Sequence, residues 1–202
     1  MPYPDRFYPV VDSVAWVKRL TALGVGTVQL RAKDLDDAAA TTLMREALAV
    51  TAGTSTKLVV NDYWRVAIDI GAKHLHLGQE DLAVADLAAI RRAGLTLGLS
   101  THDDEELEVA LRAAPDYIAL GPVFPTTLKS MRFAPQGIPK LTTWKQRIGD
   151  IPLVAIGGIK FEQAAEIYAT GADSIAVVSD VTQNADPDAR VRAWLGQSAE
   201  AA

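Results

Sequence analysis

The chain has 202 residues, 49% of them hydrophobic and 22% charged, with a mean hydropathy of +0.10. This is the composition of an ordinary globular protein, and the length suits one domain with a substantial core. The net charge of −5 argues against non-specific nucleic-acid binding, and the absence of cysteine excludes disulfides, thiolate metal sites and cysteine catalysis.

The sequence shows no sign of a targeting or membrane segment. Its first residues, MPYPDRFYPVVD, lack a basic stretch followed by an apolar core, and no apolar run is long enough to span a bilayer. We therefore expect a cytoplasmic protein that binds neither membrane nor nucleic acid.

Short apolar runs recur at intervals of about 25 residues, a spacing that predicts repeated strand–helix units. Several runs, such as LVV, LVAI and IAVV, are continuously apolar, which is typical of parallel strands buried on both faces. In chain order the eight predicted strands are Phe7–Val11, Thr27–Arg31, Leu58–Asn61, His74–Leu77, Thr96–Ser100, Tyr117–Leu120, Leu153–Ile156 and Ser174–Val178.

Amphipathic segments lie between these strands and predict helices. The first begins after Ser13, whose side chain can cap it, and ends before Gly24, a typical C-terminal glycine. The eight predicted helices cover residues 14–23, Leu35–Val50, Trp64–Ile70, Leu82–Ala93, Asp103–Ala113, Lys140–Ile148, Phe161–Thr170 and Ala189–Leu195.

Eight strands alternating with eight helices predict a single α/β domain, a (β/α)8 TIM barrel over residues 1–196, followed by a disordered tail at 197–202. The rival fold is an open doubly wound sheet. That fold usually has fewer strands and a glycine-rich turn after its first strand, and this sequence has no such turn. The barrel is therefore favoured.

Polar residues gather at the carboxyl ends of the predicted strands, where barrels of this kind build their active sites. The strand beginnings carry mostly ordinary surface residues. Gln29, Arg31 and Lys33 are spaced by two, so a strand would point them to one side. The polar clusters are Gln29–Asp34, Asn61–Asp62, His74–Asp81, Ser100–His102, Gly157–Ile159 and Val178–Asp180.

The segment Gly121–Gly137 follows the sixth strand and fits neither helix nor strand, because it contains three prolines. Its hydroxyls Thr126 and Thr127, with the cations Lys129 and Arg132, are suited to holding an anion such as a phosphate. Taken alone, the segment would be better interpreted as a solvated crossover loop, and the polar clusters at the other strand ends are what favour an anion site.

Two carboxylates, Asp62 and Asp81, end neighbouring strands and suit a Mg²⁺ ion that keeps several of its waters. A zinc site is disfavoured, since cysteine is absent and histidine is scarce. Arg31, Lys33 and Lys129 could surround a polyphosphate held by the metal. An alternative for Asp62 is a structural cap on the helix that starts at Trp64.

A second anion site is predicted at Gly157–Gly158 and Val178–Ser179, where such barrels often bind phosphate through backbone amides after strands seven and eight. Two anion sites in one mouth, one of them assisted by a metal, suggest two phosphorylated substrates.

The remaining histidines, tryptophans and acids are interpreted as structural. Asp103–Glu106 is typical of an acidic first helical turn. We interpret as packed or hydrogen-bonded side chains His74, His76, His102, Trp16, Trp64, Trp144 and Trp194.

Nine stretches resemble the thiamine phosphate synthase family, barrel enzymes of thiamine biosynthesis. They occur in the family's order over nearly the whole chain and are highly specific together, although no single one would be. They read YPVVD (8–12), QLRAKD (29–34), NDYW (61–64), HLGQEDL (76–82), GLSTHDDEE (98–106), DYIALGPVFPT (116–126), APQG (134–137), AIGGI (155–159) and SIAVVSDVTQ (174–183).

The resemblance implies that hydroxymethylpyrimidine diphosphate is joined to hydroxyethylthiazole phosphate, giving thiamine phosphate and pyrophosphate, with Mg²⁺ required. It implies a dissociative reaction, in which neutralising the leaving pyrophosphate matters more than a general base. The absence of an obvious nucleophile is consistent with that expectation.

The resemblance also assigns roles to residues. The expected catalytic residues are Arg31, Lys33, Lys129 and Ser100, and the expected Mg²⁺ ligands are Asp62 and Asp81. The expected substrate contacts are Gln29 and Asn61 for the pyrimidine, Arg31, Lys33 and Lys129 for the diphosphate, Ser100, Thr126 and Thr127 for phosphate or pyrimidine, and Gly158, Val178 and Ser179 for the thiazole phosphate.

One position departs from the family pattern. The family usually reads Pro-Thr-any-Thr-Lys at the start of the loop, whereas this chain has Leu128 before Lys129. Either Thr127 supplies the hydroxyl from one residue earlier or one phosphate contact is absent, which would cost about 1.5–3 kcal/mol.

Two other functions were weighed. A thiazole tautomerase would need neither the metal nor the diphosphate site, so the charged cluster argues against it. A weakly active barrel that binds a thiamine precursor is favoured only by Leu128. The sequence does not determine the oligomeric state, and a homodimer is one state that we consider.

Overall fold

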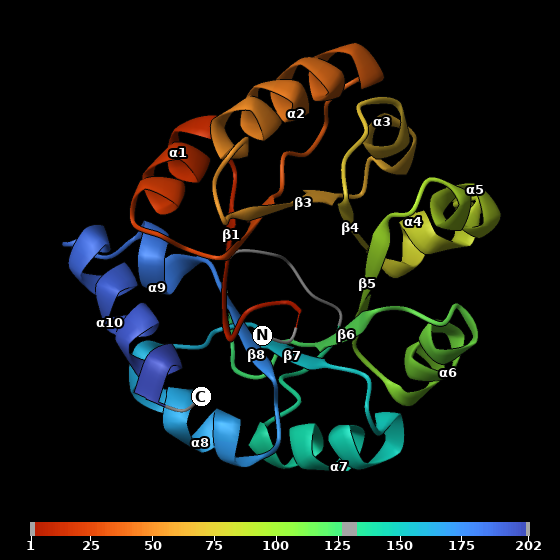
Figure 1. Cartoon of the computed structure of the whole chain (residues 1–202). Coiled ribbons are helices and arrows are strands. Elements are labelled where there is room, and N and C mark those ends of the chain that lie inside the picture. The colour runs from red at the N-terminus through yellow and green to blue at the C-terminus, as the bar shows by residue number, and fades with distance from the viewer. Residues whose placement is uncertain (1–2, 127–132, 201–202) are drawn as a thin grey trace.

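The eight predicted strands are present, and they close into one parallel barrel. The computed structural model describes residues 3–126 and 133–200, with side chains up to Gln197. Each strand pairs with its neighbours along the chain, and β8 closes the barrel on β1 (Figure 1). The strands are β1 (Phe7–Val11), β2 (Thr27–Leu30), β3 (Lys57–Asn61), β4 (His74–Leu77), β5 (Thr96–Thr101), β6 (Tyr117–Leu120), β7 (Leu153–Ile156) and β8 (Ser174–Val177).

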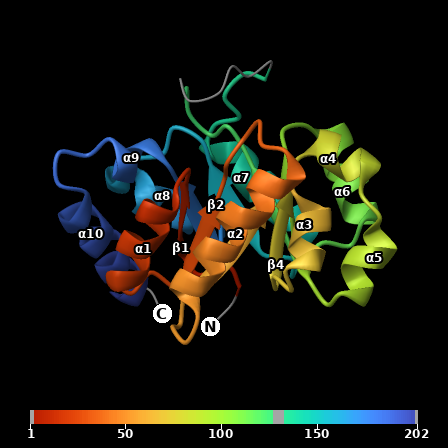
Figure 2. The same cartoon turned by 90° about the horizontal axis from the view of Figure 1, so that it is seen from above.

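The helices surround the barrel and cover the outer face of its strands, as Figure 2 shows from the side. This arrangement confirms the predicted (β/α)8 fold. The helices are α1 (Val14–Ala22), α2 (Asp37–Thr51), α3 (Trp64–Asp69), α4 (Gln79–Val84), α5 (Leu87–Arg92), α6 (Asp104–Arg112), α7 (Ile138–Ile148), α8 (Ala164–Ala169, after a 3₁₀ turn at Phe161–Gln163), α9 (Ser179–Thr182) and α10 (Pro187–Glu200). Helix α10 thus extends into the segment 197–202 that was expected to be a tail.

One predicted helix is wrong, because Leu82–Ala93 is two helices. Ala85 has an extended ψ of 140°, which ends α4. Asp86 then caps α5 by accepting a hydrogen bond from the Ala89 N–H at 2.9 Å. The apolar residues of the two short helices continue one another's spacing, so periodicity alone does not reveal the break. Helix α9 was also not predicted, since four residues are too few to show a helical period.

Local capping explains where two of the longer helices begin. Ser13 caps α1, its Oγ lying 3.4 Å from the Trp16 nitrogen that donates to it. Asp103 caps α6 by accepting from the Glu106 N–H at 2.9 Å. Three acids then occupy the first turn of α6, as predicted, where they complement the positive end of the helix dipole.

The core has two layers. The larger layer lies between strands and helices and contains the fully buried Trp144 and Trp194, which confirms their predicted packing role. A smaller layer fills the barrel interior and includes Tyr8, Val59 and Tyr117. Within the described part of the chain, no helix is long and apolar enough to cross a membrane.

Tyr117 lies across the barrel interior because its neighbour on β5 has no side chain. A Cβ on Gly98 would come within 1.9 Å of the Tyr117 ring, so a larger residue at this position would displace the ring. The glycine therefore determines where the Tyr117 hydroxyl lies, close to the barrel axis.

Candidate active site at the carboxyl ends of the strands

Two cavities of contrasting chemistry lie at the carboxyl ends of the strands. The axial cavity, of about 390 Å³, lies over the barrel interior and is lined by residues of most strand ends. The rim pocket, of about 340 Å³, lies beside it at the ends of β2, β3 and β4. Eleven of the thirteen predicted site residues line one cavity or the other. Gln29, Arg31, Asn61, Ser100, Thr126, Gly158, Val178 and Ser179 line the axial cavity, and Lys33, Asp62 and Asp81 line the rim pocket.

The other two predicted residues, Thr127 and Lys129, lie outside the described residues, as do Leu128 and Arg132. The expectation that Gln29, Arg31 and Lys33 point to one side is wrong for Lys33. Strand β2 ends at Leu30, so the alternation carries no further than Arg31, and Lys33 reaches the rim pocket instead.

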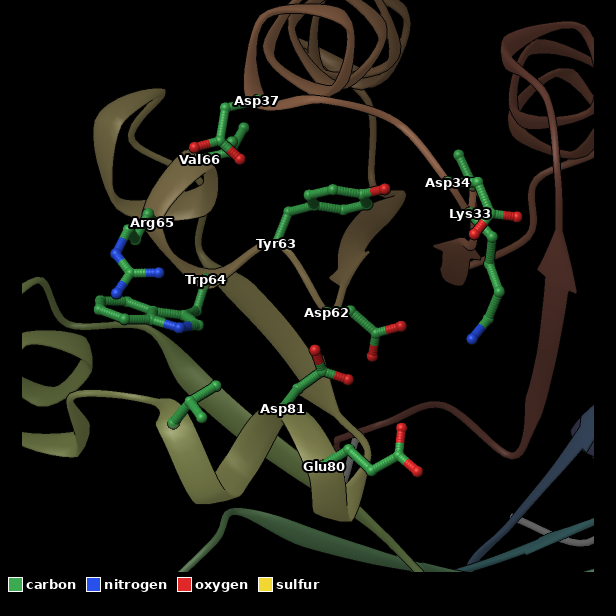
Figure 3. A pocket seen from close by; sticks show the side chains of 12 residues that line it. Lys33, Asp34, Asp37, Asp62, Tyr63, Trp64, Arg65, Val66, Glu80 and Asp81 are labelled. Atoms are coloured by element: carbon green, nitrogen blue, oxygen red, sulfur yellow. The ribbon is translucent and has the colours of Figure 1, made fainter.

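The rim pocket brings two carboxylates into contact. Asp62 and Asp81 face each other, with Lys33 and Glu80 extending towards the same opening (Figure 3). Burial, followed by the negative charge of Asp62 and a hydrogen bond to it, raises the pKa of Asp81 to about 6. Lys33 offsets this only in part. The pocket is lined by five acids and by two cations, Lys33 and Arg65, so it carries more negative charge than its cations balance.

Asp62 adopts a left-handed backbone conformation that aims its side chain into this pocket. Its φ is +67°, and its N–H donates to the His76 carbonyl at 2.9 Å. The alternative that Asp62 caps α3 is wrong, because the N-cap residue is Tyr63 and no side chain accepts a capping hydrogen bond there. A left-handed non-glycine residue is strained and is frequent at functional sites.

The donor set of the rim pocket suits a hard cation. In the described residues, no three acidic, histidine or cysteine side chains converge on one point. Mg²⁺ nevertheless needs only one or two protein carboxylates, since it keeps waters and takes the remaining oxygens from substrate phosphates. Asp62 and Asp81 provide that number, and they would hold the ion.

The axial cavity contains a continuous chain of hydrogen bonds between neutral side chains. Gln29 Nε2 donates to the Tyr8 hydroxyl at 2.7 Å, and this hydroxyl lies 2.8 Å from that of Tyr117. The Tyr117 hydroxyl lies 2.9 Å from His76 Nδ1, and His76 Nε2 lies 2.7 Å from Ser100 Oγ. Each group is held by its neighbours, so the cavity wall is pre-organised.

Burial lowers the pKa of His76 to about 4, so the imidazole is neutral at pH 7. The predicted interpretation of His76 as a packed, hydrogen-bonded residue is confirmed. His74 is similar: it bonds Thr96 Oγ1 at 2.7 Å, and burial lowers its pKa to about 4. His102 bonds Glu106 at 2.6 Å and stacks on Phe133 with ring centroids 4.6 Å apart.

Asn61 supplies a hydrogen-bond donor without a partner. The residue is only 4% exposed, yet Nδ2 has no hydrogen-bond partner among the residues that the structure describes. A buried N–H group without a partner is costly, so such a group in a cavity wall is suited to a ligand.

The opposite wall of the axial cavity is backbone. Gly157 and Gly158 have φ values of +104° and +67°. A Cβ on Gly158 would lie 2.5 Å from the Pro125 carbonyl oxygen, so only glycine allows the end of β7 to approach the β6 loop this closely. Val178 and Ser179 follow β8 and line the same side of the cavity.

The base of the loop after β6 is fixed on both described sides. The Val123 N–H donates to the Ile156 carbonyl at 2.9 Å, which ties the outgoing chain to β7. The Gly137 N–H donates to the Val123 carbonyl at 3.0 Å, which ties the returning chain to the outgoing one. Thr126 lies directly beyond this base and lines the axial cavity.

The sequence reasoning missed Tyr8 and Tyr117, which were treated as ordinary apolar strand residues. A signal was available, because Gln29 and His76 lie inside predicted strands and buried polar groups need partners. Tyrosine hydroxyls on the facing strands are the partners that meet this need.

Comparison with known proteins agrees with this geometry. A family model described as thiamine monophosphate synthase matches residues 7–181. A thiamine-phosphate synthase from Rhizobium etli is 58% identical over 195 residues, covering 96% of each chain. One from Klebsiella pneumoniae is 54% identical over 186 residues, covering 92% of this chain and 88% of that protein.

A solved structure leads to the same family. A thiamine phosphate pyrophosphorylase from Pyrococcus furiosus has a TM-score of 0.84 at 27% identity and covers 96% of each chain. A 3-hexulose-6-phosphate synthase has a TM-score of 0.69 at 13% identity, a likeness of fold alone. These comparisons do not favour the tautomerase or the binding barrel. The chain belongs to the thiamine monophosphate synthase family and is a transferase that makes thiamine phosphate.

Proposed function

We propose that the enzyme joins hydroxymethylpyrimidine diphosphate to hydroxyethylthiazole phosphate with the help of Mg²⁺. The bond between the pyrimidine methylene carbon and the diphosphate oxygen breaks, and its electron pair leaves with pyrophosphate. The thiazole nitrogen then donates its lone pair to that carbon and forms the new bond. The observation that carries the proposal is that an acidic rim pocket lies beside an axial cavity whose wall is held by hydrogen bonds between neutral side chains and to which Arg31 adds a cation.

The rim pocket is proposed to bind the diphosphate. Bound Mg²⁺ would neutralise the charge that develops on the leaving pyrophosphate. Asp62 and Asp81 would hold the ion, while Lys33 from one side and Arg31 from the axial cavity pair with the phosphate oxygens. This assignment accounts for the two adjacent carboxylates, whose negative charge the cations of the pocket balance only in part.

The axial cavity is proposed to bind the two rings and the second phosphate. Gln29 and Asn61 would contact the pyrimidine, Ser100 would contact the pyrimidine or its diphosphate, and Thr126 would add a hydroxyl from the loop. The thiazole phosphate would bind the backbone and side chains of Gly158, Val178 and Ser179.

The proposed reaction needs little help from a general base. The aminopyrimidine ring can stabilise positive charge on its methylene carbon, so departure of pyrophosphate needs electrostatic help more than proton transfer. We further propose that residues 1–196 act as one catalytic domain and that the protein works in the cytoplasm, as expected for a biosynthetic enzyme. A homodimer remains the proposed assembly to test by light scattering.

The test is product formation by the purified chain with both substrates, with and without EDTA. We expect thiamine phosphate and pyrophosphate in equal amounts, and loss of both when EDTA removes the metal. Absence of product with Mg²⁺ present would refute the proposal. Tautomer conversion of the thiazole that persists in EDTA would favour the isomerase instead.

Leu128→Thr tests the departure from the family pattern. We expect kcat/KM to rise by about 10- to 150-fold, the value of one hydrogen bond to a charged group, or to stay unchanged if Thr127 already supplies the hydroxyl. A rise of many hundredfold from near zero would instead support the weakly active binding barrel.

A further inference from the structure

The hydrogen-bond chain in the axial cavity takes one side chain from each of five strands. Tyr8 comes from β1, Gln29 from β2, His76 from β4, Ser100 from β5 and Tyr117 from β6. Tyr8 and Tyr117 are 1% and 0% exposed, so they have no water to bond. They lie beneath the cavity and do not line it, whereas Gln29 and Ser100 at the two ends of the chain do.

The number of hydrogens on these groups determines which group donates at each step of the hydrogen-bond chain. Gln29 donates to the Tyr8 oxygen, so the Tyr8 hydrogen is free to bond Tyr117. The Tyr117 hydrogen then bonds His76 Nδ1, which places the imidazole hydrogen on Nε2. That hydrogen bonds the Ser100 oxygen.

The opposite direction would leave a buried hydrogen without an acceptor. If Ser100 donated to His76 Nε2, His76 Nδ1 would donate to Tyr117 and Tyr117 would donate to Tyr8. Tyr8 would then receive two hydrogens, one from Tyr117 and one from Gln29. Its own hydrogen would then have no partner among the contacts of the chain. Only rotation of the Gln29 amide, which would turn its oxygen towards Tyr8, would give this hydrogen an acceptor. The orientation of the amide and the direction of donation along the hydrogen-bond chain are therefore coupled.

This direction determines what the cavity offers a ligand. Gln29 uses one of its two Nε2 hydrogens in the hydrogen-bond chain, so its Oε1 is left as an acceptor. Ser100 receives a hydrogen from His76, so its own hydrogen is left as a donor. Asn61 Nδ2, the buried N–H without a partner, is a second donor in the same wall.

We propose that Tyr8 and Tyr117 are positioning residues that set the specificity of the enzyme for an aminopyrimidine over an oxopyrimidine. An aminopyrimidine presents an N–H donor beside a ring-nitrogen acceptor, and this edge complements one acceptor and one neighbouring donor. An oxopyrimidine presents the reverse pattern and leaves both protein groups unpaired. The proposal rests on the proposed function, because it specifies how the pyrimidine subsite of that reaction discriminates.

Phenylalanine variants can test the hydroxyls without losing the rings. The Tyr117 ring contacts those of Tyr8 and Tyr3 edge-to-face, with centroids 6.0 and 5.7 Å apart, and phenylalanine keeps these contacts. Tyr8→Phe frees the Gln29 amide to rotate, and Tyr117→Phe separates Tyr8 from His76. Tyr168→Phe is the matched control, because its hydroxyl donates to the Arg6 carbonyl on the outer side of the barrel at 2.7 Å.

The first measurement compares binding of aminopyrimidine diphosphate with that of its oxo analogue by calorimetry, alongside steady-state kinetics. In Tyr8→Phe and Tyr117→Phe we expect the preference for the amino compound to fall about tenfold. We also expect KM for the pyrimidine diphosphate to rise by a similar factor, while KM for the thiazole phosphate and kcat change by less than about threefold. Tyr168→Phe should keep the preference of the native chain. Unchanged preference in both cavity variants would overturn the proposal.

The second measurement is the ¹⁵N NMR spectrum of the His76 imidazole in the native chain. We expect a hydrogen on Nε2 and a bare Nδ1, and a hydrogen on Nδ1 instead would overturn the assigned direction. The binding comparison does not require turnover. A native chain that makes no thiamine phosphate would refute the proposed function alone, provided that the amino preference is present and falls in the two variants.

Discussion

The axial cavity and the rim pocket lie side by side at the carboxyl ends of the strands, but their polar side chains are balanced to different extents. Five side chains in and beneath the wall of the axial cavity are neutral and hydrogen-bond one another across five strands of the barrel, although Asp12 and Arg31 also line this cavity. The rim pocket holds two carboxylates in contact and a lysine that balances them only in part. The neutral side chains thus find hydrogen-bond partners within the protein, whereas the acids of the rim pocket keep an excess of negative charge.

Under the proposed function, this difference would separate recognition of the substrate rings from catalysis. Neutral donors and acceptors that are held rigidly can distinguish one ring from another at little electrostatic cost. The excess negative charge of the rim pocket is suited to a metal ion that would bind a diphosphate. The diphosphate is the group on which charge develops in the proposed reaction.

The largest effect is expected in the rim pocket, from Asp62→Asn. Asparagine tolerates the left-handed φ of +67° at this position, so the fold should be kept. We expect kcat/KM to fall by about 100- to 1,000-fold, the usual cost of a lost electrostatic contact to the transition state. The melting temperature should stay the same or rise, because the repulsion of two carboxylates is removed.

Asp34→Asn is the matched control, since Asp34 lines the same pocket with a φ of +59°. Its kcat/KM should change by less than about threefold. Equal losses in both variants, measured by product formation, would show that charge anywhere in the pocket matters and that Asp62 is not a specific ligand.

Acid is expected to act on the two regions in opposite directions. The pKa of His76 is lowered from 6.5 to about 4, so the unfolded chain binds more protons between these values, and stability falls as the pH falls. At pH 5 the loss relative to pH 7 should be about 2 kcal/mol from this residue. The pKa of Asp81 is raised from 3.8 to about 6, so in buffer without metal its protonation favours the folded state as the pH falls.

Urea titrations of the free energy of unfolding across pH 4–7 check these signs. The native chain should lose stability below pH 6.5, and Asp81→Asn should lose it more steeply in metal-free buffer. In Asp81→Asn, where the opposing titration of Asp81 is absent, a free energy of unfolding that does not change between pH 7 and pH 5 would contradict the neutral, buried states of His74 and His76.

The smallest effect is expected at the boundary between the two regions, from Arg31→Lys. Arg31 lines the axial cavity although Lys33, two residues later, lines the rim pocket. Lysine keeps the charge but loses the planar fork, so KM for the pyrimidine diphosphate should rise about tenfold. Lys33→Arg should raise it by less than about threefold. A change in KM for the thiazole phosphate instead would assign Arg31 to the second phosphate.

Much of the barrel was determined by local sequence. Continuous apolar runs and their regular spacing located all eight strands to within one residue, because a strand buried on both faces must be apolar along its length. The clustering of polar residues at strand ends located the mouth for a related reason: polar groups at these positions are the ones that remain accessible. The break at Ala85 is not visible in the sequence, since the apolar residues of the helices on either side of it follow one continuous helical spacing.

Tertiary structure alone decided which polar groups meet. Tyr8 and Tyr117 are 109 residues apart and touch only because the barrel closes β1 on β8 and brings β6 across the axis from β1. Gly98 permits this contact through the absence of a side chain on a third strand. The separation of Arg31 from Lys33 likewise follows from where β2 ends. Two groups hydrogen-bond when they lie close together in space, and their separation along the sequence does not reveal whether they do.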